Sequence, residues 1–228
     1  MKGVIRTRDI LAHPVVTVRC FGWRIFIRAL FTSQHQTLLS LLQNDSYFQA
    51  STAKAPAILD RCVGMELQAM EIYDALARCF PNASPCRIFL GALADQERHH
   101  AELLELCRAA TIRGEWDDPT FLPWAEHVPR LERKLKEAKE SLPSAGSHEK
   151  ALQIVAEIEF SEINQVFLGV IEATDSGFVR SVAPFRRCVE DHIAFICKWL
   201  SRLGRDDILA ASKELRAKFL RPVNEGTL

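Results

Sequence analysis

Residues 95–104 read DQERHHAELL, and this stretch decides the fold. Glu97 and His100 are three positions apart, so both side chains leave the same face of an α-helix. Apolar residues around them recur every three or four positions, as in a helix that buries one face. The stripe consists of Phe89, Leu93, Gln96, His100, Leu103 and Cys107. The pattern predicts a helix over residues 85–110 with an imidazole on its buried face and a carboxylate beside it.

The same helical period continues on both sides of this stretch, and alternation typical of strands is almost absent. Pro81 and Pro85 mark a short turn before the helix, and Gly204 is a C-terminal stop signal. The predicted long helices cover residues 57–80, 85–110, 150–174 and 182–203, with a charged connecting helix at 128–141. Two tight turns and one long crossover therefore predict an all-α four-helix bundle.

Carboxylates also interrupt the inner stripes of the other predicted helices. Glu66 lies inward on the first helix, and Glu159 and Glu162 lie three apart on the third. Lys and Arg are absent from these stripes, so buried carboxylates there would lack a cationic partner, which is costly. A bound metal ion removes that cost. Carboxylate and imidazole ligands suit iron or manganese, with zinc as an alternative.

Three motifs carry a family resemblance. The run ELQAMEIY at 66–73 resembles the first helix of rubrerythrin-like proteins of the ferritin-like superfamily, where E-x-x-A-x-x-x-Y holds a metal-binding glutamate. DQERHHAELL looks like the second helix of that family with its E-x-x-H. The run EFSE at 159–162 is similar to the E-x-x-E of its third helix. The resemblance covers about residues 57–203.

The resemblance implies a ferritin-like four-helix bundle with one long crossover and a site for two iron ions. It also implies peroxide- or oxygen-linked iron redox chemistry of the peroxidase or ferroxidase type. No rubredoxin-like cysteine pairs are present, so the electron donor would be external and is not identified. The implied metal ligands are Glu66, Glu97, His100, Glu159, Glu162 and His192.

Two positions keep alternatives open. Val189 stands where the resemblance leads us to expect a glutamate three residues before His192. Either the site works without that ligand, or the bundle has lost its redox chemistry and serves as an interaction or assembly module. Tyr73 is a tentative catalytic residue as a redox-active neighbour of the metal. It can equally be a core aromatic whose hydroxyl is hydrogen-bonded.

The rest of the chain divides into a helical N-terminal extension and linker at 1–56 and a C-terminal helix and tail at 204–228. The apolar stretch at 15–31 is interrupted by three arginines, Arg19, Arg24 and Arg28. That stretch either packs on the bundle or a second subunit, which we favour, or lies on an anionic membrane surface. By analogy with other bundles we expect a homodimer.

Composition narrows the function classes. The formal net charge is zero, so nothing global indicates a nucleic-acid partner. Seven cysteines without a CxxC pair are typical of reduced thiols in a cytoplasmic protein. Arginines interrupt every apolar run near the N-terminus, and no run of 18 apolar residues occurs, so we expect neither a signal peptide nor a transmembrane helix.

Overall fold

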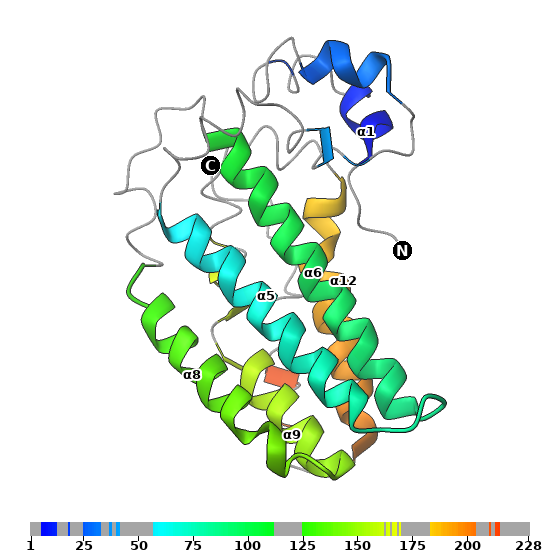
Figure 1. Ribbon diagram of the computed structural model, residues 1–228, viewed down its shortest axis with the longest axis vertical. Helices are drawn as coiled ribbons and strands as arrows, with labels where there is room; N and C mark the ends of the chain where they lie inside the picture. The colour runs from blue at the N-terminus through cyan, green and yellow to red at the C-terminus, as the bar shows by residue number, and fades with distance from the viewer. Residues whose placement is uncertain are drawn as a thin grey trace.

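The described part of the chain is helical. The computed structural model describes residues 6–12, 18, 25–32, 37, 40–41, 57–111, 125–161, 163–164, 166–167, 169, 183–203, 210 and 213–214. These residues form helices and turns and no strand, apart from an isolated bridge between Arg6 and Thr37. The prediction of an all-α protein is therefore confirmed for the described residues (Figure 1).

Two long antiparallel helices, α5 (Ala57–Arg78) and α6 (Pro85–Thr111), pack side by side along most of their length (Figure 1). The tight turn predicted between them is closed by a hydrogen bond from the Ser84 backbone N–H to the Pro81 carbonyl, at 2.9 Å. The Ser84 hydroxyl oxygen then accepts from the Arg87 N–H near the start of α6. Helix α5 ends two residues before the predicted boundary at residue 80, within ordinary fraying.

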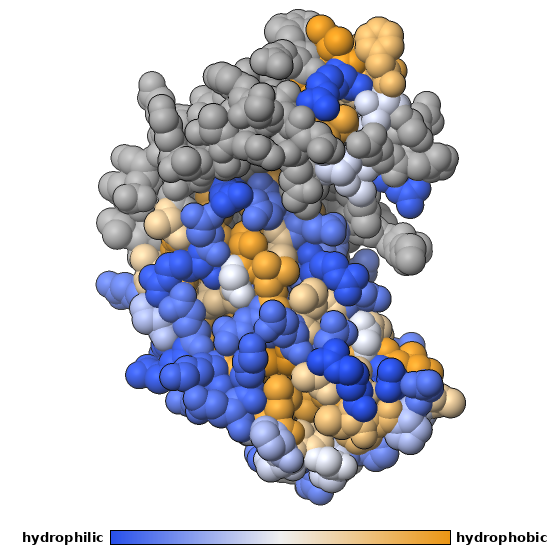
Figure 2. Space-filling model, viewed as in Figure 1, coloured by the Kyte–Doolittle hydropathy of each residue, from blue (hydrophilic) through white to orange (hydrophobic). Residues whose placement is uncertain are grey.

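Helix α8 (Val128–Ser141) has the predicted bounds of the connecting helix. Its apolar residues pack on α5, while its charged residues cover the opposite face, which is mainly hydrophilic in Figure 2. The short 3-10 helix η2 (Leu142–Ser144) leads to α9 (His148–Glu159). Ser147 caps α9, because its hydroxyl oxygen accepts the Lys150 backbone N–H.

The prediction of one continuous helix over 150–174 is wrong, because α9 ends at Glu159. Phe160 has φ −84° and ψ 1°, and a turn at 160–161 precedes the next helical residues. Side chains stabilise the interruption. The Ser161 hydroxyl oxygen accepts the Ile163 N–H, and Asn164 Nδ2 donates to the Glu159 carbonyl. That carbonyl is one of those left without a partner at a helix end.

Helix α12 (Ala183–Leu200) continues into the 3-10 helix η3 (Ser201–Leu203), in agreement with the helix predicted over 182–203. It packs on α6. Of the predicted C-terminal helix and tail at 204–228, residues 210, 213 and 214 are helical and the others lie outside the described residues. None of the described helices combines the length and the apolar character needed to cross a membrane.

The N-terminal extension contributes α1 (Thr7–Leu11) and helical residues at 25–30. Ile25, Ala29 and Leu41 belong to the same cluster of buried apolar residues as the long helices. Phe31, at the end of this stretch, is 87 % exposed. Residues 42–56, which include the predicted linker, and the positions of Arg19 and Arg24 lie outside the described residues.

Candidate metal centre

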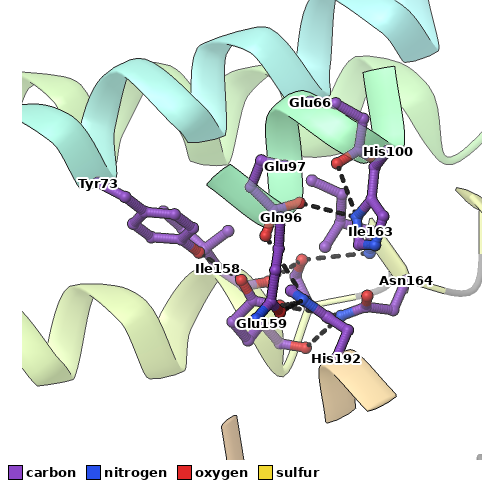
Figure 3. Close-up of polar contacts among 11 residues, drawn as sticks. Glu66, Tyr73, Gln96, Glu97, His100, Ile158, Glu159, Ile163, Asn164 and His192 are labelled. Atoms are coloured by element: carbon purple, nitrogen blue, oxygen red, sulfur yellow. Dashed lines mark hydrogen bonds and ion pairs between the residues drawn. The ribbon is translucent and has the colours of Figure 1, made fainter. Parts of the chain in front are cut away.

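Five ionisable side chains from four helices meet in the interior (Figure 3). Each keeps between 1 % and 3 % of its surface exposed. Glu66 comes from α5, Glu97 and His100 from α6, Glu159 from α9 and His192 from α12. The burial of Glu66, His100 and Glu159, which helix periodicity predicted to lie inward, is therefore confirmed. Glu97, predicted beside the buried face, and His192, implied only by the resemblance, are buried as well.

Helix α6 supplies the centre of the cluster. Glu97 Oε2 lies 2.9 Å from His100 Nδ1, as the spacing of three residues predicts. Glu66 Oε2 approaches the same nitrogen from α5, at 3.6 Å. The His100 ring packs on the Phe167 ring with centroids 4.4 Å apart, and this apolar contact restricts its orientation.

Glu97 links His100 to His192. Its second oxygen, Oε1, lies 3.6 Å from His192 Nε2 and has no hydrogen-bond partner among the described residues. A buried carboxylate oxygen without a partner costs roughly 1–3 kcal/mol. Glu97, His100 and His192 each offer a ligand atom, and these atoms lie within 4.8 Å of one another. A buried set of one carboxylate and two imidazoles can hold a metal ion.

Glu159 lies on the other side of His192. Its Oε2 is 3.0 Å from His192 Nε2 and 3.0 Å from Asn164 Nδ2. Its Oε1 accepts the Tyr73 hydroxyl proton at 2.5 Å. Burial alone would raise the pKa of Glu159, but the His192 charge and the hydrogen bonds from His192, Tyr73 and Asn164 lower it below its ordinary value. Glu159 is therefore held as a carboxylate.

Burial has the opposite result at two neighbouring groups. Desolvation raises the pKa of Glu97 well above its ordinary value despite the attraction of His100. The Tyr73 hydroxyl is also desolvated, and the negative charge of Glu159 further raises its pKa. Tyr73 thus keeps its proton and donates it in a hydrogen bond. A nearby cation would favour the charged form of Glu97.

Sequence reasoning missed two amide side chains of the site. Gln96 Oε1 lies 2.7 Å from His192 Nδ1, although Gln96 appeared merely as a member of the inner stripe of its helix. Asn164 Nδ2 donates to both the side-chain oxygen Oε2 and the backbone carbonyl of Glu159. Asn164 and Gln165 both lie between Ile163 and Val166, and the sequence pattern does not distinguish Asn164 from its neighbour.

Glu162, a predicted ligand, and Val189, which stands in place of an expected ligand, are not placed by the described side chains. Glu162 lies outside the described residues. Val189 lies within α12, three residues before His192, but its side chain is outside the description. The predicted ligand role of Glu162 and the consequence of Val189 therefore stay predictions.

Comparison with protein-family models, with curated proteins and with solved structures finds no match to this chain. The chain's own residues indicate a metal centre: five buried ionisable groups, converging ligand atoms and a carboxylate oxygen that has no hydrogen bond among the described residues.

Proposed function

We propose that this chain is a ferritin-like, rubrerythrin-related metalloprotein that carries out redox chemistry of iron with peroxide or oxygen. The observation that carries the proposal is the position of Glu97. This buried carboxylate lies between two buried histidines and turns one oxygen toward each of them. Such an arrangement is costly for the chain alone and favourable around cations.

The residues suit two neighbouring ions that share Glu97. Glu66 and His100 would hold one ion, and Glu159 and His192 the other. Oxygen and imidazole donors are consistent with iron, with manganese or zinc as alternatives. Glu162, three residues after Glu159 in the sequence, is the further ligand that the resemblance implies.

The fold part of the proposal is a ferritin-like bundle made by α5, α6, α9 and α12, with α8 in the long crossover. It rests on the order of these helices and on the meeting of their inner side chains in one cluster. We further propose a homodimer, by analogy with other bundles of this kind.

Two bound Fe(II) ions would supply the two electrons that reduce one peroxide, with two protons, to two waters. The chain's own residues prepare the site for that chemistry. Buried apolar neighbours such as Phe167 and Ile163 exclude bulk water. Tyr73 keeps its proton on the phenol oxygen and donates a hydrogen bond to Glu159. This hydrogen bond holds the Glu159 carboxylate in contact with His192.

Metal content and oxidant-dependent iron oxidation test the proposal together. Protein purified without added metal should contain iron or manganese by elemental analysis, and anaerobic loading with Fe(II) should approach two ions per chain. Hydrogen peroxide or oxygen should then oxidise the bound Fe(II) faster than free Fe(II) in the same buffer. Protein that binds no transition metal even after reconstitution would refute the proposal.

One observation favours a second candidate function. Val189 replaces the glutamate that the resemblance leads us to expect beside His192. A bundle that had lost its redox chemistry would keep its helices and act as an interaction or assembly module. Folded, metal-free protein that captures a partner chain would support this alternative.

A further inference from the structure

His192 is held at both ring nitrogens. On one side, Nδ1 lies 2.7 Å from Gln96 Oε1. On the other side, Nε2 lies 3.0 Å from Glu159 Oε2 and 3.6 Å from Glu97 Oε1. Figure 3 shows His192 between Gln96 and Glu159. Gln96 precedes Glu97 on α6, so the same helix that supplies the central carboxylate also reaches the histidine of α12.

The chemistry of an amide oxygen decides which nitrogen stays protonated. Gln96 Oε1 has lone pairs and no proton, so it can accept a hydrogen bond and cannot donate one. The 2.7 Å contact therefore requires a proton on His192 Nδ1. A histidine that binds a metal ion is neutral and carries one ring proton, so when the Nε2 proton gives way to a metal ion, the proton stays on Nδ1 and the ligand lone pair is on Nε2. Nε2 is the nitrogen that faces Glu97 and Glu159.

We propose that Gln96 is a positioning residue that presents Nε2 of His192 to a bound metal ion. The inference rests on the proposed function, because it assigns a role within that metal site. Histidine ligands commonly donate their second ring N–H to an acceptor that fixes the tautomer and the ring orientation. Here the acceptor is an amide.

A neutral acceptor suits this position. Three carboxylates, Glu66, Glu97 and Glu159, are already buried around the two histidines. A further carboxylate beside His192 would add negative charge to a site where each buried charge is costly. An amide orients the ring through one hydrogen bond without that cost. Gln96 also joins α6 to α12 at the level of the site.

Zinc affinity tests the role of Gln96 in variants of the full chain. Gln96→Leu removes the acceptor and should weaken Zn²⁺ binding by about 10–100-fold, the usual loss for an outer partner of a metal ligand. Gln96→Glu restores an acceptor oxygen and should bind Zn²⁺ more tightly than Gln96→Leu. Gln153→Leu is the matched control, because Gln153 contacts Glu157 on α9, away from the cluster. Calorimetric titration measures all four proteins.

Nitrogen NMR of the zinc-loaded wild-type chain supplies a readout that does not depend on how a variant folds. Histidine labelled with ¹⁵N should show His192 with a protonated Nδ1 and zinc on Nε2, and the signal is assigned by its loss in His192→Asn. Zinc on Nδ1 would overturn the inference. Unchanged zinc affinity in Gln96→Leu would also overturn it and leave the proposed function intact. A wild-type chain that binds no metal would overturn both.

Discussion

The two halves of the candidate metal centre are built differently. On the α5–α6 side, Glu66, Glu97 and His100 project from uninterrupted helices that pack along most of their length. On the α9–α12 side, Glu159 is the last residue of its helix, and His192 lies on α12, which packs on α6. Residue spacing on regular helices determines the first half, and tertiary contacts determine the second.

The difference appears in the hydrogen bonds of the carboxylates. Glu97 has one partner for Oε2 and none for Oε1 among the described residues. Both oxygens of Glu159 are bonded, to Tyr73 on one side and to Asn164 and His192 on the other. Glu97 is thus the carboxylate with free capacity for a cation, and Glu159 is the one fixed by the protein itself.

The largest effect should follow from removing the residue that both halves share. Glu97→Ala should abolish metal binding, with an affinity loss greater than the roughly 100-fold seen at most for an outer partner. The reason is that the ions on the His100 and His192 sides would both lose the ligand that they share. Elemental analysis after reconstitution, and calorimetric titration, measure the loss.

The control for this change is Glu102→Ala, on the same helix but more exposed, with 36 % of its side-chain surface accessible. Metal content should be normal in that variant. Unchanged metal content in Glu97→Ala would mean that Glu97 is no ligand and that the two halves do not share it.

The same contrast explains how far the sequence could predict the structure. Helices α5, α6 and α8 follow from apolar period, proline and cap signals, and their inward Glu66, Glu97 and His100 follow from the same period. The end of α9 could not be predicted. No proline or glycine marks it, and apolar residues at 163, 166 and 167 continue the helical pattern beyond it.

Side-chain contacts in the folded protein end helix α9. Asn164 and Ser161 bond the backbone at the turn, and Asn164 also reaches the Glu159 carboxylate. Gln96 is likewise ordinary in its sequence context and gains its role from the approach of α12. Single-residue patterns carry no signal for such long-range pairs, because the partner lies far away in the sequence.

The second largest effect should come from removing the Tyr73 hydroxyl. This change tests how strongly the α9–α12 side depends on a hydrogen bond from α5. Tyr73→Phe leaves Glu159 Oε1 buried without its hydrogen bond, and should lower the free energy of unfolding by about 1–3 kcal/mol. Urea unfolding of the metal-free protein measures this change.

A double-mutant cycle isolates the Tyr73–Glu159 contact from the other effects of the substitution. The cycle combines Tyr73→Phe with Glu159→Gln, and a coupling energy near zero would contradict the structural role of the pair. Metal-loaded Tyr73→Phe separates the two interpretations of Tyr73. Slower oxidant-dependent turnover at normal metal content supports a redox role, whereas normal turnover leaves Tyr73 a structural hydrogen-bond donor.

A smaller effect on metal binding should follow from adding a carboxylate to the α9–α12 side. Val189→Glu introduces a carboxylate one turn before His192 on α12. We expect metal affinity, or the rate of oxidant-dependent turnover, to rise on the order of tenfold. This is the low end of the roughly 10–100-fold changes that residues around metal ligands usually cause. Ala194→Glu, at an exposed position of the same helix, is the control. If Val189→Glu destabilises the fold without raising occupancy, position 189 does not face the metal site.

The smallest effect on stability should come from removing an ion pair that lies outside both sides of the metal centre. It is the reference with which the changes inside the centre are compared. Arg61 on α5 donates to both Glu132 oxygens on α8, at 2.7 and 2.9 Å, with about 40 % of each side chain exposed. The hydrogen bond from Arg61 lowers the pKa of Glu132. At this exposure solvent screens the pair, so Glu132→Gln should cost about 0.5 kcal/mol at neutral pH.

The pH dependence of this cost follows from the direction of the pKa shift. A carboxyl group whose pKa is lower in the folded state adds stability above its unfolded pKa and loses it as pH falls through the folded value. The difference between wild type and Glu132→Gln should therefore be full at about pH 7 and vanish at about pH 3, measured by urea unfolding. It should also be equal in metal-free and metal-loaded protein, because Glu132 lies on α8, which supplies none of the five clustered side chains. A difference that changes on metal loading would show that α8 is coupled to the site and that the contrast between the two halves is incomplete.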